Sequence, residues 1–172
     1  VKVGTLEQQA SGIHAATAMG VEYSNDMQSW ATLSHDTLSF AGDGVHRYIV
    51  TADSAVSARY VRVKVVGTSW FFLDEIEVLQ VKDPNPDANE NPDYGVELNL
   101  LRGNTGYTVS QRPSMNNITG LLTDGKYGST YTRYDPNWMG FNTTGHVVIN
   151  FDLRAPGSVS QIILSSREDS AN

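Results

Sequence analysis

The chain is built from short β-rich runs separated by turn-forming residues, and this pattern constrains its fold more than any other feature. Runs rich in valine, isoleucine, tyrosine and threonine are typical of strands, and they occur at residues 1–6, 19–24, 48–51, 60–66, 75–81, 147–153 and 159–165. Glycine, proline, asparagine and aspartate predict turns at 24–26, 42–44, 123–125 and 155–158. No amphipathic helix longer than a turn or two is evident. The sequence therefore predicts an all-β fold, an antiparallel sandwich or jelly roll.

Composition excludes several classes of partner. The net charge of -7 repels a phosphate backbone, and the 12 lysines and arginines do not cluster along the sequence, so we expect no nucleic acid partner. No apolar run approaches the roughly 20 residues that cross a bilayer, so we do not expect a membrane partner. The chain has no cysteine, so any stapling comes from packing or from a metal with oxygen ligands.

An acidic, proline-rich segment divides the chain. Residues 82–95 contain almost nothing to bury and are typical of a semi-rigid linker. A calcium loop made of the carboxylates in this segment is less favoured, because the glycine turn and spaced ligands of an EF-hand are missing. We therefore expect two parts, 1–81 and 96–172, that form one domain together or two half-domains.

Both parts carry motifs that resemble the discoidin, or coagulation factor type C, family of galactose-binding-like domains. Residues 19–33, 58–63 and 70–78 are similar to the late strands of such a domain. The later segments are similar to its beginning, and they are 99–103, 121–126, 138–141 and 147–153. The order of the halves is thus inverted relative to the family.

This resemblance implies a jelly-roll β-sandwich that is circularly permuted. The alternative is that each half pairs with a half from another chain, giving a strand-exchanged homodimer. We favour the permuted domain because a linker of about 14 residues, at up to about 3.4 Å each, can span any small domain. An unpaired half would also expose apolar faces and strand edges.

A calcium site is the strongest candidate site. The turn at 123–125 can aim a carboxylate and several backbone carbonyls at one point, as calcium prefers. The resemblance implies a cage formed by the carboxylates of Asp124 and Glu75 together with backbone carbonyls. The remaining ligands that it implies are Leu121, Lys126, Ser129 and Asp74, with Thr130 as an alternative to Ser129. The other interpretation is an ordinary turn and a solvated strand residue.

A sugar-binding surface is predicted around residue 131. Sugar recognition needs an aromatic face and a few polar groups, and one loop supplies Tyr131, Arg133, Tyr134 and Trp138. Trp138 fits a core position equally well. His14 lies in another loop that often reaches the binding edge in the family, although a lone histidine is more often structural. Packing explains the other two tryptophans, Trp30 and Trp70, better than binding does.

Catalysis is not expected. The four histidines lack the spacing of a zinc site, and His35 has no nucleophile partner. Asp74 and Glu75 are adjacent in a predicted strand, so their side chains should point to opposite faces and could not flank one glycosidic bond.

Together these features predict a non-catalytic carbohydrate-binding accessory module, with a structural calcium and a glycan or polysaccharide as partner. No leader opens the sequence, so we expect any secretion signal to have been removed or to lie upstream. An extracellular or cell-surface location is expected, and the composition fits a bacterial surface protein. The alternative is a structural spacer or an adhesion domain that binds no sugar.

Overall fold

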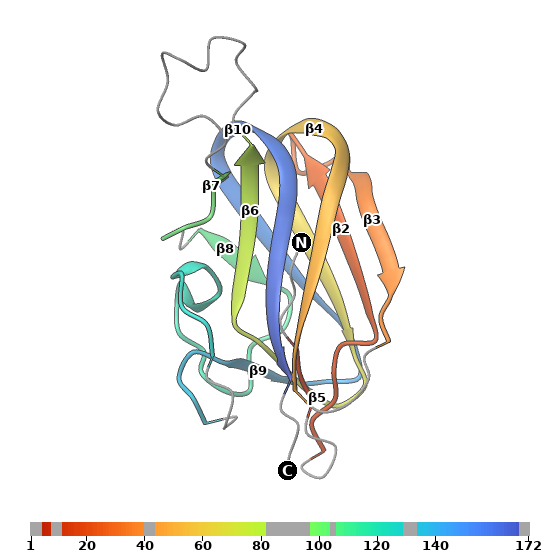
Figure 1. The fold of residues 1–172 in the computed structure, drawn as a ribbon, viewed down its shortest axis with the longest axis vertical. Coiled ribbons are helices and arrows are strands. Elements are labelled where there is room, and N and C mark those ends of the chain that lie inside the picture. The colour runs from red at the N-terminus through yellow and green to blue at the C-terminus, as the bar shows by residue number, and fades with distance from the viewer. Residues whose placement is uncertain are drawn as a thin grey trace.

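The computed structural model describes residues 5–7, 12–39, 44–81, 97–103, 106–128 and 134–168. Within these residues the chain is mostly strand, with one short 3-10 turn, η2, at Leu121–Thr123 (Figure 1). The strands are β1 (Thr5–Glu7), β2 (Ala18–Ser24), β3 (Ala31–Thr37), β4 (Gly44–Gly67), β5 (Trp70–Leu73), β6 (Glu75–Val81), β7 (Glu97–Asn99), β8 (Tyr107–Val109), β9 (Met139–Asn142) and β10 (Gly145–Glu168). The all-β prediction is confirmed, and the pairing among the described residues is antiparallel apart from one β1–β10 contact and an isolated bridge between Ile13 and Trp70.

A long two-stranded ribbon organises the fold. β4 and β10 each contain 24 residues and pair antiparallel along most of their length, from Gly145 opposite Gly67 to Arg167 opposite Val45. Figure 1 shows both strands rising, bending over at one end of the molecule and returning. The ribbon therefore contributes one limb to each of two layers.

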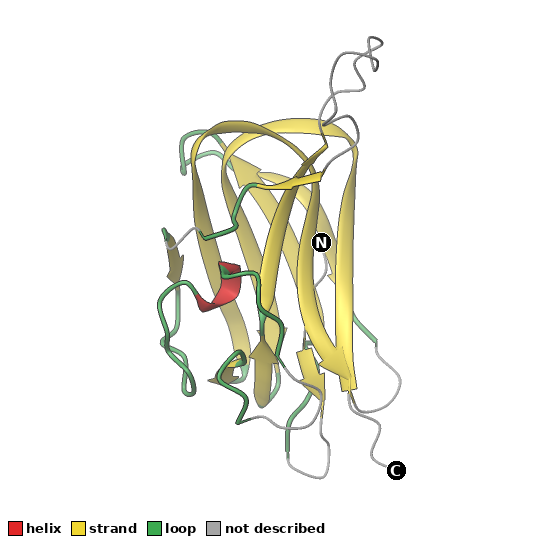
Figure 2. Cartoon of the chain, turned by 60° about the vertical axis from the view of Figure 1, so that its left-hand side comes forward, coloured by secondary structure: helices red, strands yellow, loops and turns green. Residues whose placement is uncertain are grey.

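Each limb of the ribbon is extended by shorter strands. The first limb consists of residues 60–67 of β4 and 145–152 of β10. On this limb β2 pairs with β4, β3 pairs with β2, and β8 pairs with β10. The second limb consists of residues 44–51 of β4 and 161–168 of β10. On this limb β1 pairs with β4, β6 pairs with β10, and β7 pairs with β6. Strands β5 and β9 form a separate small sheet. Figure 2 shows the bent strands joining the two layers at one end, so the fold is sandwich-like.

One hydrophobic core lies between these layers. On the first limb, alternate residues of β10 are buried, as the two-residue period of a strand requires, and these are Val147, Ile149 and Phe151. From the other limb, Val50 and Ile162 belong to the same buried cluster. Residues before and after the segment 82–96 therefore share one core and one sheet.

The bend was not expected from the sequence. Residues 48–51 and 60–66 were predicted as two strands, and so were 147–153 and 159–165, but each pair is one continuous strand. The predicted turn at 155–158 is instead an irregularity within β10. Its register shifts between Asp152 and Gly157, and Arg154 has a positive φ of 70°. The turn-forming residues bend the ladder without ending it, as a β-bulge does.

The segment 99–103, which is similar to the opening strand of a discoidin domain, is a strand only at Asn99. β7 ends at Asn99, and residues 100–103 form a turn. The side-chain Oδ1 of Asn99 accepts a hydrogen bond from Leu101 N at 3.0 Å, a local contact that favours a turn over a strand. β3 was not predicted, because its sequence is mostly polar and it lies at the edge of the sheet. No helix in the described ranges is long and apolar enough to span a membrane.

Separating the chain at the segment 82–96 tests whether its two sides fold together. Residues 1–81 and 97–172 expressed as separate chains should each lack a cooperative unfolding transition, because each loses its partner in the ribbon and half of the core. Co-expressed, the two fragments should purify as a 1:1 complex with the β-rich circular dichroism of the intact chain. Two fragments that fold independently and do not associate would show that the shared core is unnecessary.

Candidate functional site

Two buried carboxyl groups lie between β5 and β6. β5 buries Phe71, Phe72 and Leu73, and the chain then passes through Asp74 into Glu75 without returning to the surface. Asp74 and Glu75 are each 1% exposed. Burying a carboxylate is costly unless it is hydrogen-bonded or paired with a cation, so the surroundings of these two groups carry information about function.

The loop after η2 covers both carboxyl groups. Gly125 N donates to Glu75 Oε1 at 3.2 Å, and Gly128 N donates to Asp74 Oδ2 at 3.0 Å. Asp74 Oδ1 also accepts from Glu75 N at 2.7 Å. The prediction that Asp74 and Glu75 point to opposite faces was wrong. Asp74 lies outside both strands, so the alternation of a strand does not apply to it.

Glycine is required at two positions of this loop. Gly125 has a φ of +79°, in the left-handed region that most side chains avoid. At Gly128 an added Cβ would lie 2.2 Å from Cε2 of Trp138, so the backbone packs directly on the indole ring. The left-handed backbone at Gly125 and the packing of Gly128 on Trp138 hold the loop close enough for its amides to reach the carboxyl groups.

The Glu75 carboxyl is electrostatically unusual. Burial raises its pKa to about 8, and the negative charges of Asp124, Glu77 and Asp74 add to this rise, while the hydrogen bond from Gly125 N opposes it. Oε2 of Glu75 is buried, and no hydrogen-bond partner is found for it in the described structure. The group is therefore either protonated or neutralised by a cation.

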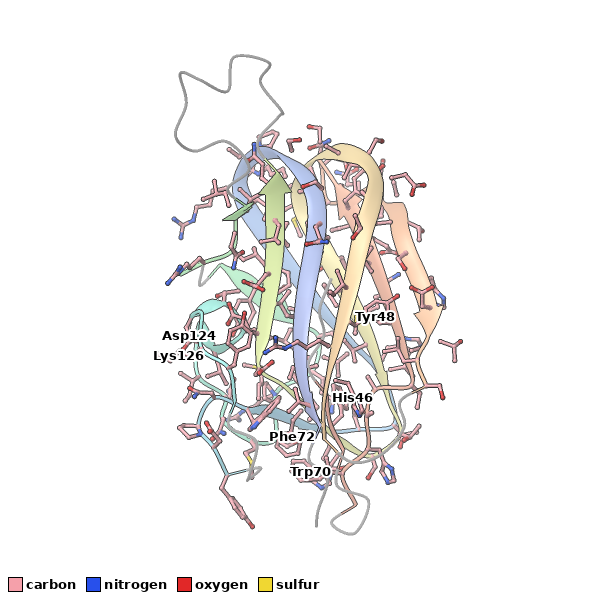
Figure 3. The ribbon with its side chains drawn as sticks, in the orientation of Figure 1. His46, Tyr48, Trp70, Phe72, Asp124 and Lys126 are labelled. Atoms are coloured by element: carbon pink, nitrogen blue, oxygen red, sulfur yellow. The ribbon has the colours of Figure 1, made fainter. Side chains whose placement is uncertain are left out.

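Asp124 forms the outer part of the same turn. Its Oδ1 accepts from Lys126 N at 2.9 Å, and its Oδ2 lies 3.3 Å from Lys126 Nζ. Figure 3 shows the Asp124 and Lys126 side chains side by side at the edge of the molecule. Leu121 is buried in the core, so only its backbone can serve a ligand.

Five of the six predicted calcium ligands thus belong to one loop or to the two residues that the loop covers. The sixth, Ser129, lies outside the described residues, as does its alternative Thr130. Three or more His, Asp or Glu side chains arranged to hold a metal are not found in the described ranges. The predicted cage contains only two carboxylates, those of Asp124 and Glu75, and takes its other oxygens from backbone carbonyls.

The predicted sugar-binding residues are only partly described. Tyr131 and Arg133 lie outside the described residues. Trp138 is 0% exposed and packs with Ile13 and Phe72, so its ring has no face for a sugar and the core alternative is correct. His14 is half-buried, and its backbone N–H donates to the backbone carbonyl of Trp70 at 2.8 Å. No contact between His14 and the loop after η2 is found within the described part.

Two exposed tyrosines flank the segment 129–133. Tyr134, noted in the sequence, is 67% exposed, and Tyr127 is 43% exposed. The Arg47 guanidinium lies 5.0 Å from the centre of the Tyr127 ring, and Asn137 Nδ2 donates to Tyr127 O at 3.4 Å. Sequence reasoning missed Tyr127. The available signal was its position directly after the predicted 121–126 motif.

The other two tryptophans differ from each other. Trp70 is partly buried and stacks on Phe72 with ring centres 5.9 Å apart, as packing predicted (Figure 3). Trp30 is a surface residue whose ring lies 3.7 Å from the Arg62 guanidinium carbon, and it lines an open hollow of about 330 Å³. It lies directly before β3 with intermediate burial, so of the two predicted places, core or strand end, it takes the strand end.

Known proteins add nothing to this geometry. No family model, curated protein or solved structure matches the chain. The resemblance to discoidin domains accordingly depends on the motifs alone, and the ligand assignments that it implies stay predictions.

The pKa of Glu75 predicts how stability depends on pH when divalent ions are absent. Because this pKa rises from 4.5 to about 8 on folding, the stabilising contribution is complete below the lower value and is lost as the pH rises through the upper one. One pKa unit corresponds to about 1.4 kcal/mol, so the free energy of unfolding should fall by a few kcal/mol over this window. Urea denaturation in a chelator measures it.

The Glu75→Gln variant is the control for this measurement. It keeps the shape of the side chain and removes its titration, so its stability should lack this fall. Parallel pH profiles for the variant and the wild type would show that Glu75 does not titrate in this way.

Proposed function

We propose that the chain is a non-catalytic carbohydrate-binding module of a secreted or cell-surface protein, stabilised by a bound calcium ion. The observation that carries the proposal is the pair of exposed tyrosines, Tyr127 and Tyr134, on either side of 129–133. Exposed aromatic faces bind the apolar side of a pyranose ring. Tyr131 and Arg133 are predicted to add an aromatic ring and a hydrogen-bond donor from the segment between them.

The calcium part of the proposal is supported by Glu75. A buried carboxyl oxygen that has no hydrogen-bond partner among the described residues, beside further carboxyl groups, is the arrangement that a divalent cation would neutralise. The carboxylates of Glu75 and Asp124 would bind the ion, with carbonyl oxygens of Asp74, Leu121 and Lys126. Ser129 is the predicted sixth contributor. The ion would supply positive charge and cross-linking rather than chemistry.

The permuted arrangement is part of the same proposal. The loop at 121–128 follows the segment 82–96, whereas the carboxyl groups it covers precede that segment. A calcium ion between them would tie the two sides of the chain at a second place, besides the ribbon. A single jelly-roll domain with inverted halves, rather than a strand-exchanged dimer, fits the pairing of β4 with β10 within one chain.

Catalysis by Asp74 and Glu75 is not part of the proposal, although the two carboxyl groups face the same loop. Both are 1% exposed, and both oxygens of Asp74 accept backbone N–H groups. Acid groups held in this way are not accessible to a glycosidic bond in a polysaccharide.

A calcium-stiffened spacer without sugar binding is the second candidate. The burial of Trp138 favours it, because that residue was one of the aromatic groups assigned to the sugar surface. The spacer shares the calcium site with the first candidate. It differs only in that the surface around Tyr127 and Tyr134 binds no sugar.

Calcium should raise the melting temperature of the chain. At a calcium concentration about 100 times the dissociation constant, the gain of about 2.7 kcal/mol corresponds to a rise of about 5 to 10 °C. Calorimetry with calcium and then with a chelator measures the rise. Glu75→Gln should lose it, whereas Glu22→Gln, whose carboxylate pairs with Arg62 and Lys64, should keep it. An equal response in the wild type and Glu75→Gln would place the ion elsewhere.

Removing an exposed tyrosine should weaken sugar binding without unfolding the protein. Tyr134→Ala and Tyr127→Ala should each weaken binding to the preferred glycan about tenfold or more, because each removes a stacking face. A glycan array identifies the ligand, and calorimetric titration measures the loss. Tyr60→Ala, on β4 beneath Arg59, is the matched control and should bind normally. Absence of any glycan binding by the wild type would favour the spacer.

A further inference from the structure

A hollow of about 240 Å³ lies between β8 and the loop that follows it. Three polar side chains contribute to its lining, those of Arg112, Asn117 and Thr119, and its apolar part includes Tyr107, Val109 and Met139. Met139 is 1% exposed. The hollow therefore combines a buried apolar floor with polar groups, the composition of a small-ligand site.

The walls of this hollow are held in place. On one side, Tyr107 pairs with Phe151 and Val109 with Ile149 in the main sheet. On the other, Asn116 Nδ2 donates to Asp135 O at 3.0 Å and to Trp138 O at 2.8 Å. A ligand would enter a preformed site and would not have to order the loop, which reduces the entropic cost of binding.

The polar groups of the hollow are available to a ligand. Arg112, Asn117 and Thr119 are exposed, and no hydrogen bond or ion pair of their side chains is found within the described structure. The hollow beside Trp30 differs in this respect. There Asn25 bonds to Ser57 O and Arg59 N, and Asp26 accepts from Gln28 N and Ser29 N, so the polar groups hold their own turn.

The chemistry of the first hollow selects an acidic ring-shaped ligand. A guanidinium group binds a carboxylate through two parallel hydrogen bonds, and an amide and a hydroxyl bind sugar hydroxyls. The Tyr107 ring and Met139 offer apolar surface to a pyranose face. No Asp or Glu contributes to the lining, although the chain has a net charge of -7. At physiological salt, charges beyond about 8 Å are largely screened.

We infer that the hollow between β8 and the 110–120 loop is a second sugar site, which binds a uronic acid unit through Arg112. The site is separate from the tyrosine surface at 127–134 and shares no predicted residue with it. It is linked to the calcium loop through Tyr107, whose hydroxyl accepts from Leu122 N at 3.4 Å, and through Ile118 O, which accepts from Leu121 N at 3.3 Å. It can therefore be tested whether or not the tyrosine surface binds sugar.

Amide NMR spectra of the full chain in calcium, titrated with galacturonic acid and separately with galactose, test the inference. Galacturonic acid should shift amides within 107–119 and saturate, and galactose should bind more weakly there because it lacks the carboxylate. Arg112→Gln should weaken galacturonic acid binding by roughly 10- to 100-fold. Arg154→Gln removes the same charge from the bend of β10, outside the hollow, and should leave binding unchanged.

Three results would overturn the inference. They are the absence of saturable shifts within 107–119, unchanged affinity in Arg112→Gln, and equal affinity for galactose and galacturonic acid. Shifts confined to 127–137 would support the tyrosine surface and reject the second site. Shifts confined to 107–119 would support the second site and leave the tyrosine surface to be judged from its own variants.

Discussion

The pairing of β4 with β10 is the constraint on which the rest of the structure depends. It joins residues from before and after the segment 82–96 in one ladder. Every other strand of the main sheet pairs with this ladder directly or through one neighbouring strand. The ladder is also secured beside its bend. Arg59 Nη2 lies 3.2 Å from Asp152 Oδ2, and Asn25 bonds across to Ser57 O at 3.1 Å. Side-chain contacts therefore accompany the bulge at the bend.

The carboxyl pair at 74–75 follows from this frame. The ribbon carries β6 on its returning limb, and β6 brings Glu75 into the interior, where the 121–128 loop meets it. The loop offers one amide to each carboxyl group and leaves Glu75 Oε2 without a hydrogen bond among the described residues. A fold that needed only packing here would be better served by apolar residues, because a buried carboxyl without full compensation costs stability. This arrangement, in which Glu75 is either protonated or neutralised by a cation, is the observation on which the proposed calcium site depends.

The sequence predicted what alternation and composition can encode. β2 and β6 were located closely, because their valine, isoleucine and tyrosine residues are typical of strands. β3 escaped prediction because an edge strand needs few apolar residues. The bend in β10 was mistaken for a turn, since proline and glycine mark both. The shared orientation of Asp74 and Glu75 depends on one residue between two strands, which a strand pattern cannot reveal. For Trp138, sequence allowed core or surface, and its complete burial against Ile13 and Phe72 decided between them.

The ribbon also has a consequence for the order of folding. Val45 pairs with Arg167, so the ladder closes only when nearly the whole chain is present. During synthesis β4 emerges long before β10. Its edge therefore stays unpaired with β10 until β10 has been made. Ladders between residues so distant in sequence form slowly, because the entropy of loop closure is lost before the contacts are gained. The exposed β-rich early segments are thus a kinetic vulnerability, and chaperone protection matters most before β10 has been made.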